Sequence, residues 1–221
     1  MREHRTISIA DQIFDQLEHD ILAGKYKRGE LLSETKLSED LGVSRTPVRE
    51  AIRRLEQENI IEDSSKGLIV VGISREDMPD MYEVRLRIES LAAERAAVNI
   101  SDEALAEMAE VVDMQRYYID KQAEKEVDNS DSIKNLDSRF HEIIYIESKS
   151  KPLADILIPL HKRMTKFRKA SVRKNSRAEA SWQEHAAIYE AIKAHDSKKA
   201  GELMKVHLAN ARDSIMTIEE D

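Results

Sequence analysis

One aspartate and three histidines in the second half of the chain have the residue types and spacing of a metal site. Asp137 and His141 are four positions apart, so on a helix both side chains lie on one face. His185 and His207 lie in two later segments of helical periodicity, and ligands from separate helices can converge on a cation inside a bundle. The alternative is a group of buried, hydrogen-bonded histidines. The other histidines have no companion at a suggestive spacing and are expected to be surface or ordinary residues: His4, His19, His161 and His195.

The metal expected in such a site is a divalent ion. Imidazole and carboxylate ligands suit zinc first, with nickel, manganese and iron as alternatives. The same ligands could serve a metal-dependent hydrolase built on the bundle, which is the alternative function. That chemistry needs an open metal position and a general base beside it. The sequence has no HExxH-like pairing of a base with a ligand.

A second group of residues, in the first quarter of the chain, predicts DNA binding. Arg45, Arg49 and Arg53 are four positions apart and form one stripe on a helix, next to an apolar stripe that includes Val48 and Ile52. Such a helix packs on its domain with one side and offers guanidinium groups to the major groove with the other. Arginine pairs there with guanine O6 and N7. The alternative is the solvated face of an ordinary helix.

The residues around this stripe form a winged helix-turn-helix pattern. A helix is predicted over residues 34–41, capped by Ser33 and ended by Gly42, and the arginine helix follows after Ser44. Ser44 and Thr46 at its start can reach phosphate. Two β-prone runs, 60–61 and 68–71, flank a turn at 64–67 and predict a hairpin wing with Lys66 at its tip. A further helix, capped by Ser8, is expected over residues 8–23.

Only helical periodicity is found beyond residue 74. Apolar residues mark helices around 81–91, 105–115, 133–144 and 156–167, the last with a kink expected at Pro159. Ser181 and Glu184 resemble a capping box that opens the fifth helix, which places His185 in its first turn. The predicted fold is therefore mainly α, with an N-terminal winged helix-turn-helix domain over residues 1–73 and a C-terminal all-α helical bundle over residues 74–221.

Composition limits the class of protein. The chain has no cysteine, which excludes disulfides and thiolate metal sites. No stretch approaches the roughly 18 apolar residues of a membrane helix, and the first residues lack the apolar core of a signal peptide, so a cytoplasmic protein without a membrane partner is expected. The net charge is −8, and residues 1–73 hold 11 Lys and Arg against 14 Asp and Glu. DNA binding must therefore depend on where the positive charges lie.

The segment Leu32–Leu55, above all its part Val43–Ala51, closely resembles the signature of the GntR family of bacterial transcription regulators. The resemblance covers about residues 8–71, and Lys66–Gly67 fits the wing of that family. It implies that Arg45 and Arg49 read or clamp DNA, with Ser44, Thr46, Lys66 and Gly67 near the backbone or the minor groove. Some members have a further DNA-contacting arginine where this chain has Thr35, and the neighbouring Lys36 is a candidate substitute.

The rest of the chain resembles the FCD effector domain of the FadR-like branch of that family, over about residues 77–215. Three segments carry the resemblance: Arg139–His141, Glu184–His185 and His207–Leu208. It implies that Asp137, His141, His185 and His207 bind a metal ion and that a carboxylate of a small effector fills its open positions. Arg85, in a segment similar to the first helix of that domain, is the candidate for binding the anionic effector. An ion pair between Arg85 and a glutamate of the bundle is the alternative.

The predicted function is ligand-responsive regulation of transcription. Effector binding would change how two DNA-binding domains are held across a homodimer on a palindromic operator in double-stranded DNA. A dimer is expected because helix-turn-helix proteins usually read two half-sites, because the bundle offers apolar surface, and because FCD regulators are dimers. A fatty-acyl-CoA sensor, also found in this branch, would dispense with the metal, and the complete aspartate and histidine set argues against it.

Overall fold

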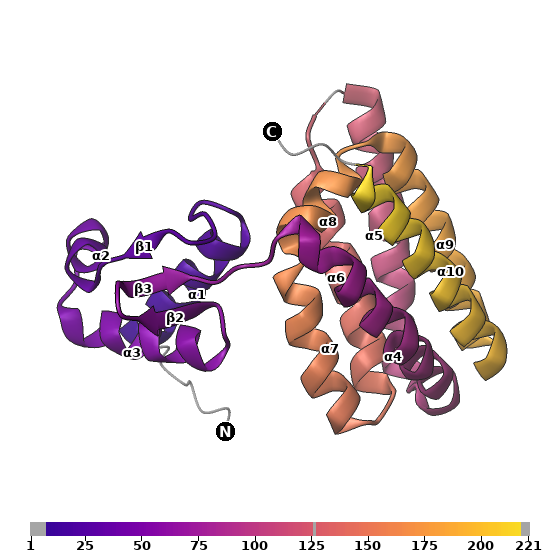
Figure 1. Ribbon diagram of the computed structural model, residues 1–221. Helices are drawn as coiled ribbons and strands as arrows, with labels where there is room; N and C mark the ends of the chain where they lie inside the picture. Colours follow the sequence, from indigo (N-terminus) through magenta and orange to yellow (C-terminus); the bar gives the residue numbers. More distant parts are fainter. Residues whose placement is uncertain (1–7, 126, 218–221) are drawn as a thin grey trace, which may run out of the picture. The chain divides into compact units, whose positions relative to one another are not determined.

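The computed structural model describes residues 8–125 and 127–217, so His4 lies outside the described residues. Its contacts divide the chain into two compact units, with the division between Ser74 and Arg75 (Figure 1). The first unit combines helices with a small sheet, and the second is helical throughout its described residues. None of the described helices is both long enough and apolar enough to cross a membrane.

The first unit is a winged helix-turn-helix domain. Its elements are α1 (Ile9–Leu22), β1 (Leu31–Leu32), α2 (Glu34–Leu41), α3 (Arg45–Gln57), β2 (Ile61–Ser64) and β3 (Gly67–Val70). The strands form one antiparallel sheet in the order β1-β3-β2, and Ser64 pairs with Gly67 at the end of the β2–β3 hairpin. The sequence did not predict strand β1, because two residues are too few to show the alternation of apolar and polar side chains that marks a strand.

Local capping signals set the bounds of the first two helices. The Ser8 side chain accepts a hydrogen bond from the backbone N–H of Asp11, and the backbone N–H of Ser8 donates one to the Asp11 carboxylate, so the two residues form a capping box at α1. Ser33 caps α2, and Gly42 ends it in a left-handed conformation with φ of 65°. Ser44 occupies the N-cap position of α3 without a side-chain capping hydrogen bond, so its hydroxyl is not used inside the helix.

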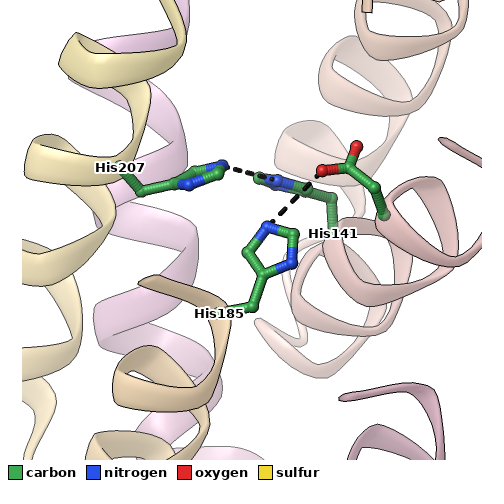
Figure 2. A group of neighbouring side chains, drawn as sticks. His141, His185 and His207 are labelled. Atoms are coloured by element: carbon green, nitrogen blue, oxygen red, sulfur yellow. Dashed lines mark hydrogen bonds and ion pairs between the residues drawn. The ribbon is translucent and has the colours of Figure 1, made fainter. Parts of the chain in front are cut away.

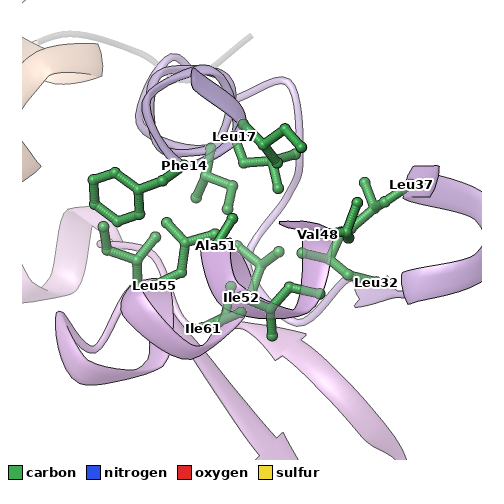
Figure 3. Packing of buried hydrophobic residues seen from close by; sticks show 13 residues of the cluster. Phe14, Leu17, Leu32, Leu37, Val48, Ala51, Ile52, Leu55 and Ile61 are labelled. Carbon is green, nitrogen blue, oxygen red and sulfur yellow. The ribbon is translucent and has the colours of Figure 1, made fainter. Parts of the chain in front are cut away.

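The core of the first unit lies between α1, α3 and the sheet (Figure 3). Phe14 and Leu17 of α1 meet Ala51 and Leu55 of α3, and Ile61 reaches the same cluster from β2. Because the apolar stripe of α3 packs in this core, Arg45, Arg49 and Arg53 remain exposed, whereas Arg54 pairs with Asp11 of α1. The hairpin wing is anchored to the same core through Ile61 and through other buried strand residues.

The second unit is a bundle of helices. Its elements are η1 (Arg75–Asp77), α4 (Met78–Asn99), α5 (Asp102–Lys125), α6 (Ser130–Glu147), α7 (Lys151–Arg163), α8 (Thr165–Val172), α9 (Asn175–Lys193) and α10 (Ser197–Met216). Helix α4 packs most extensively against α10 and also contacts α6, α7 and α9. Helix α5 packs on α6 and α9. This arrangement surrounds the interior of the bundle with α4, α6, α9 and α10.

Two sequence predictions about these helices are wrong. Helix α9 begins at Asn175, so Ser181 and Glu184 lie inside it, and His185 lies in its middle rather than in its first turn. The local capping signature is overridden because Ala178 and Trp182 pack in the interior next to Val172. The predicted fourth helix is two helices, and the interruption lies at Met164 rather than at Pro159, which stays inside α7.

Candidate metal centre and DNA-binding surface

The four predicted metal ligands lie together inside the bundle. Asp137 and His141 come from α6, His185 from α9 and His207 from α10, and all four are buried. Each offers one ligand atom, and these atoms lie within 4.8 Å of one another. Figure 2 shows the three imidazole rings reaching toward one another from their helices.

The Nε2 atoms of the three rings face one another or Asp137. His141 Nε2 lies 3.2 Å from His207 Nε2, so a hydrogen bond between them requires a proton on one of the two. His185 Nε2 lies 3.5 Å from Asp137 Oδ1 and has no hydrogen-bond partner. Converging lone pairs beside a carboxylate are what a divalent cation requires, so the residues fit a metal ion.

The outer nitrogens of His185 and His207 form hydrogen bonds with side-chain oxygen atoms, and that of His141 lies beside a carboxylate without the geometry of a hydrogen bond. Each Nδ1 lies close to an acceptor: Glu89 at 3.0 Å from His141, Gln115 at 3.0 Å from His185, and Glu184 at 2.7 Å from His207. Histidines that bind metals almost always have this second partner, because it fixes the tautomer and turns Nε2 inward. The ring of His185 is also stacked on Phe140, with 4.2 Å between the ring centres.

Burial keeps these imidazoles neutral, which is the form that binds a metal. It lowers the pKa of His141 and takes the pKa of His185 well below its usual value. Burial also lowers the pKa of His207, to about 4, against the opposing effect of Glu184. The pKa of Glu184 is raised by burial, but hydrogen bonds from His207 and Arg177 outweigh this and bring it to about 2. Glu184 is therefore a carboxylate able to accept the Nδ1 proton of His207.

Arg168 of α8, which the sequence did not single out, forms an ion pair with the second oxygen of Asp137. The guanidinium is buried, and burial followed by the charge of Arg85 lowers its pKa to about 9. Asp137 thus presents Oδ1 to His185 and Oδ2 to Arg168. Only the tertiary structure brings Arg168 to this site, since it lies 31 residues from Asp137 on another helix.

His161 corrects a sequence prediction. It was expected to be an ordinary residue, but it is only 5% exposed, and its ring centre lies 4.7 Å from that of His141. Of the other histidines in the described residues, His19 and His195 lie outside this cluster. No histidine, aspartate or glutamate lies three or four positions from His161, so no helical spacing pattern identifies it.

A small cavity with basic walls adjoins the cluster. Its volume is about 30 Å³, which is room for water but not for an organic effector in this side-chain arrangement. The basic side chains in its wall are Arg85, Lys134, Arg168 and Arg177. Arg85 is fully enclosed and forms an ion pair with Glu89, the contact that was weighed as the alternative to effector binding.

The predicted DNA-contacting residues lie on the exposed side of the first unit. Arg45, Thr46, Arg49 and Arg53 of α3 are exposed, as is Ser44, whereas the opposite side of α3 is buried. In the wing, Lys66 is exposed in the two-residue turn between β2 and β3. Gly67 has a φ of 113°, which a residue with a side chain rarely adopts, so the tight turn depends on glycine at this position. Lys36 of α2 is also exposed.

The first family comparison matches residues 9–71 to the model described as bacterial regulatory proteins of the gntR family. A second matches residues 80–210, more than half of the chain, to the FCD domain. This chain is a GntR-family transcription regulator with an FCD domain. That conclusion confirms the family predicted from the sequence and sets aside the hydrolase alternative, because the family consists of regulators rather than enzymes.

Curated relatives of this GntR regulator extend along most of the chain. YdhC, an HTH-type transcriptional regulator of Bacillus subtilis, is 27% identical over 95% of this chain and 92% of its own length. RspR, an HTH-type transcriptional repressor of Escherichia coli, is 26% identical over 98% of this chain and 92% of its own length. The gluconate operon transcriptional repressor of Bacillus licheniformis is 31% identical, but the match covers 58% of this chain and 51% of the repressor.

Solved structures share the fold of the GntR regulator. The structure of E. coli McbR/YncC superposes with a TM-score of 0.75 at 23% identity, covering 92% of this chain and 95% of that chain. A GntR regulator from Rhodococcus sp. RHA1 gives a TM-score of 0.70 at 23% identity, covering 96% of this chain and 99% of that chain. At these identities the likeness establishes the architecture, a winged helix-turn-helix unit followed by a helical bundle.

Proposed function

We propose that this regulator binds a divalent metal ion and a small carboxylate effector in its FCD bundle, and that the effector controls operator binding by a homodimer. The observation that carries the proposal is the convergence of four buried ligand atoms, within 4.8 Å of one another, from Asp137, His141, His185 and His207. The oxygen atom beside the outer nitrogen of each imidazole supports it, because such a partner favours the tautomer whose Nε2 lone pair is free to bind a metal. Zinc is the first metal to test, followed by nickel, manganese and iron.

The basic wall of the cavity supports an anionic effector. Arg85, Lys134, Arg168 and Arg177 face this space, and Asp137 is the acidic residue in its lining. A carboxylate that binds the metal would be drawn to this wall. The cavity has to open for it, and the ion pairs of the arginines are the contacts that would rearrange. The relationship to the gluconate operon repressor makes sugar acids the first compounds to test.

The exposed side of α3 supports sequence reading by Arg45 and Arg49. Both residues are exposed beside the buried stripe, so their guanidinium groups lie where they could reach base edges in a major groove. Ser44 and Thr46 lie at the N-terminus of α3, where a phosphate is favoured by the helix dipole. Lys66 and Gly67 form the tip of the wing, which suits a contact with the backbone or the minor groove.

A stripe on α4 supports the homodimer. Val84, Leu91 and Val98 are spaced seven residues apart and remain 45%, 44% and 65% exposed. The sequence periodicity that included Val84 and Leu91 marks this exposed face, while the buried face of α4 holds Arg85, Glu89 and alanines. Val206 of α10, which is 55% exposed, lies beside Leu86 of α4 in a neighbouring surface hollow. Burying such a stripe against a second copy is a favourable way to cover it.

The test begins with the purified full-length protein. Its metal content is measured, and binding sites are selected from a random double-stranded DNA library at moderate salt, because non-specific binding depends strongly on salt. Enrichment of a short palindrome would support a dimeric sequence reader. Sugar acids and hydroxy acids are then added to the complex with this operator. A change in affinity that disappears when the metal is removed supports the proposal, whereas a folded protein that binds no divalent metal contradicts its metal part.

A further inference from the structure

His161 is a buried polar group that the metal ligands do not account for. The side chain lies in α7 and is almost fully enclosed, and its Nε2 atom has no hydrogen-bond partner within the described residues. A buried nitrogen without a partner costs free energy, and native proteins contain few of them. The position of this atom therefore calls for a function.

The neighbours of the other ring nitrogen determine where the proton of His161 lies. His161 Nδ1 is 3.3 Å from Arg85 Nη2 and 3.2 Å from the Tyr145 hydroxyl. A guanidinium only donates hydrogen bonds, so Nδ1 must be the accepting, unprotonated nitrogen. An imidazole whose Nδ1 accepts from a guanidinium is neutral and carries its one proton on Nε2.

This tautomer argues against a second metal site. Glu89, His141 and His161 bring three potential ligand atoms within 4.8 Å of one another. However, the lone pair of His161 is directed at Arg85, and His141 Nδ1 lies 3.0 Å from the Glu89 carboxylate. His161 Nε2 is thus an N–H donor that faces the cluster without an acceptor.

A nearby acceptor for this donor is Asp137. Its Oδ2 atom lies 3.8 Å from His161 Nε2, slightly beyond hydrogen-bond distance, and the same oxygen is held by Arg168. The other oxygen, Oδ1, is the one that faces His185. We infer that His161 becomes a positioning residue when the metal binds: its Nε2–H then closes on Oδ2 of Asp137, which Arg168 already holds, so that Oδ1 is presented to the metal. The inference rests on the metal centre of the proposed function.

The two side chains that face Oδ2 of Asp137, those of His161 and Arg168, come from different helices. His161 lies before the interruption at Met164, and Arg168 lies in the helix that follows it. Two donors on different helices fix a carboxylate more firmly than one, because neither can move it without the other. His161 adds this restraint as a neutral group, whereas a second cation beside Arg168 would weaken the attraction of Asp137 for a metal.

Zinc affinity of the full-length protein, measured by competition with a chromophoric chelator, tests the inference. His161→Phe keeps a flat ring of similar size and removes the N–H donor. His161→Gln places an amide nitrogen at about the same reach and keeps a donor. The matched control is His195→Asn, because His195 lies outside the cluster on the same bundle and its backbone φ of 55° is one that asparagine tolerates. Circular dichroism and thermal melting of the metal-free variants check that each is folded.

The expected result is a loss of about 10- to 100-fold in zinc affinity for His161→Phe, as is typical for the loss of a partner of a metal ligand. His161→Gln should recover most of this loss, and His195→Asn should bind zinc like the wild type. Wild-type affinity in a folded His161→Phe variant would overturn the inference and leave the metal centre intact. An equal loss in His161→Phe and His161→Gln would also overturn it, because packing rather than a donor would then be responsible. If the wild type itself binds no zinc or other divalent metal, the proposed function fails first, and the inference fails with it.

Discussion

The carboxylate of Glu34 and the guanidinium of Arg49 join the two helices of the helix-turn-helix through two hydrogen bonds. Glu34 Oε2 lies 3.1 Å from Arg49 Nη2, and Oε1 lies 3.3 Å from Nε. Both side chains are partly exposed, at 31% and 54%, so the pair contributes little to stability. Its consequence concerns orientation: if Arg49 binds DNA as proposed, Glu34 sets the direction from which its guanidinium approaches.

Replacing Arg49 should weaken specific DNA binding without unfolding the protein. For Arg49→Ala we expect a loss on the order of 1–3 kcal/mol in operator affinity, because a two-pronged contact with a base is removed. Fluorescence anisotropy with the selected operator and a scrambled duplex measures this loss. Arg212→Ala, which removes an exposed arginine of α10, is the control and should bind normally. Normal operator binding by Arg49→Ala would show that Arg49 of α3 does not contact the operator as proposed.

Glu34→Gln should have a different effect from Arg49→Ala. The substitution removes a negative charge close to Arg49 and leaves the arginine less firmly oriented. We therefore expect affinity for the scrambled duplex to stay the same or rise, and the ratio of operator to scrambled binding to fall. The same anisotropy experiment, repeated at two salt concentrations, measures the affinity for the scrambled duplex separately from the ratio of operator to scrambled binding. An unchanged ratio would mean that Glu34 does not orient Arg49 on DNA.

Removal of one metal ligand should empty the bundle of metal. His185→Ala is expected to contain far less metal than the wild type after identical purification, because the Nε2 atom that faces Asp137 and the rings of His141 and His207 is lost. Elemental analysis by mass spectrometry gives the metal content. His195→Asn serves again as the control. Equal metal content in His185→Ala and the wild type would remove His185 from the site.

Metal binding should also stabilise the folded protein. Zinc that binds only the native state raises the free energy of unfolding by about 2.7 kcal/mol when its free concentration is 100 times the dissociation constant. Treatment with a chelator should therefore lower the melting temperature, and added zinc should restore it. Differential scanning calorimetry is the appropriate measurement. The melting temperature of the His185→Ala variant should change much less on addition of chelator or zinc. A wild-type melting temperature that changes with neither would argue against a metal in the bundle.

A charge in the apolar stripe of α4 should separate the dimer. Leu91→Glu places a carboxylate in the centre of the surface that Val84 and Val98 extend, and burying an unpaired charge is costly. Since Leu91 is 44% exposed within one chain, the variant should still fold. Light scattering coupled to gel filtration is expected to show a dimeric wild type and a monomeric variant. A dimeric Leu91→Glu variant would place the interface elsewhere, and a monomeric wild type would contradict the dimer itself.

The sequence alone determined the features that depend on local patterns. The family followed from an unbroken segment around Val43–Ala51, and the first two helices were bounded by caps at Ser8, Ser33 and Gly42. The group of Asp137, His141, His185 and His207 could be proposed because two members share a helix face and the others lie in separate helical segments. Patterns of this kind survive folding because they depend on neighbours within one or two turns.

Only the tertiary structure decided which distant side chains meet. Ser181 and Glu184 have the form of a helix start, but packing of Ala178 and Trp182 continues α9 back to Asn175. Arg168 and His161 join the metal cluster from α8 and α7, and no sequence spacing relates either of them to Asp137. The outer partners of the imidazoles come from α4, α5 and α9 for the same reason. Contacts across a bundle are set by how helices pack, and the periodicity of one helix reveals its buried face but not the residue opposite it.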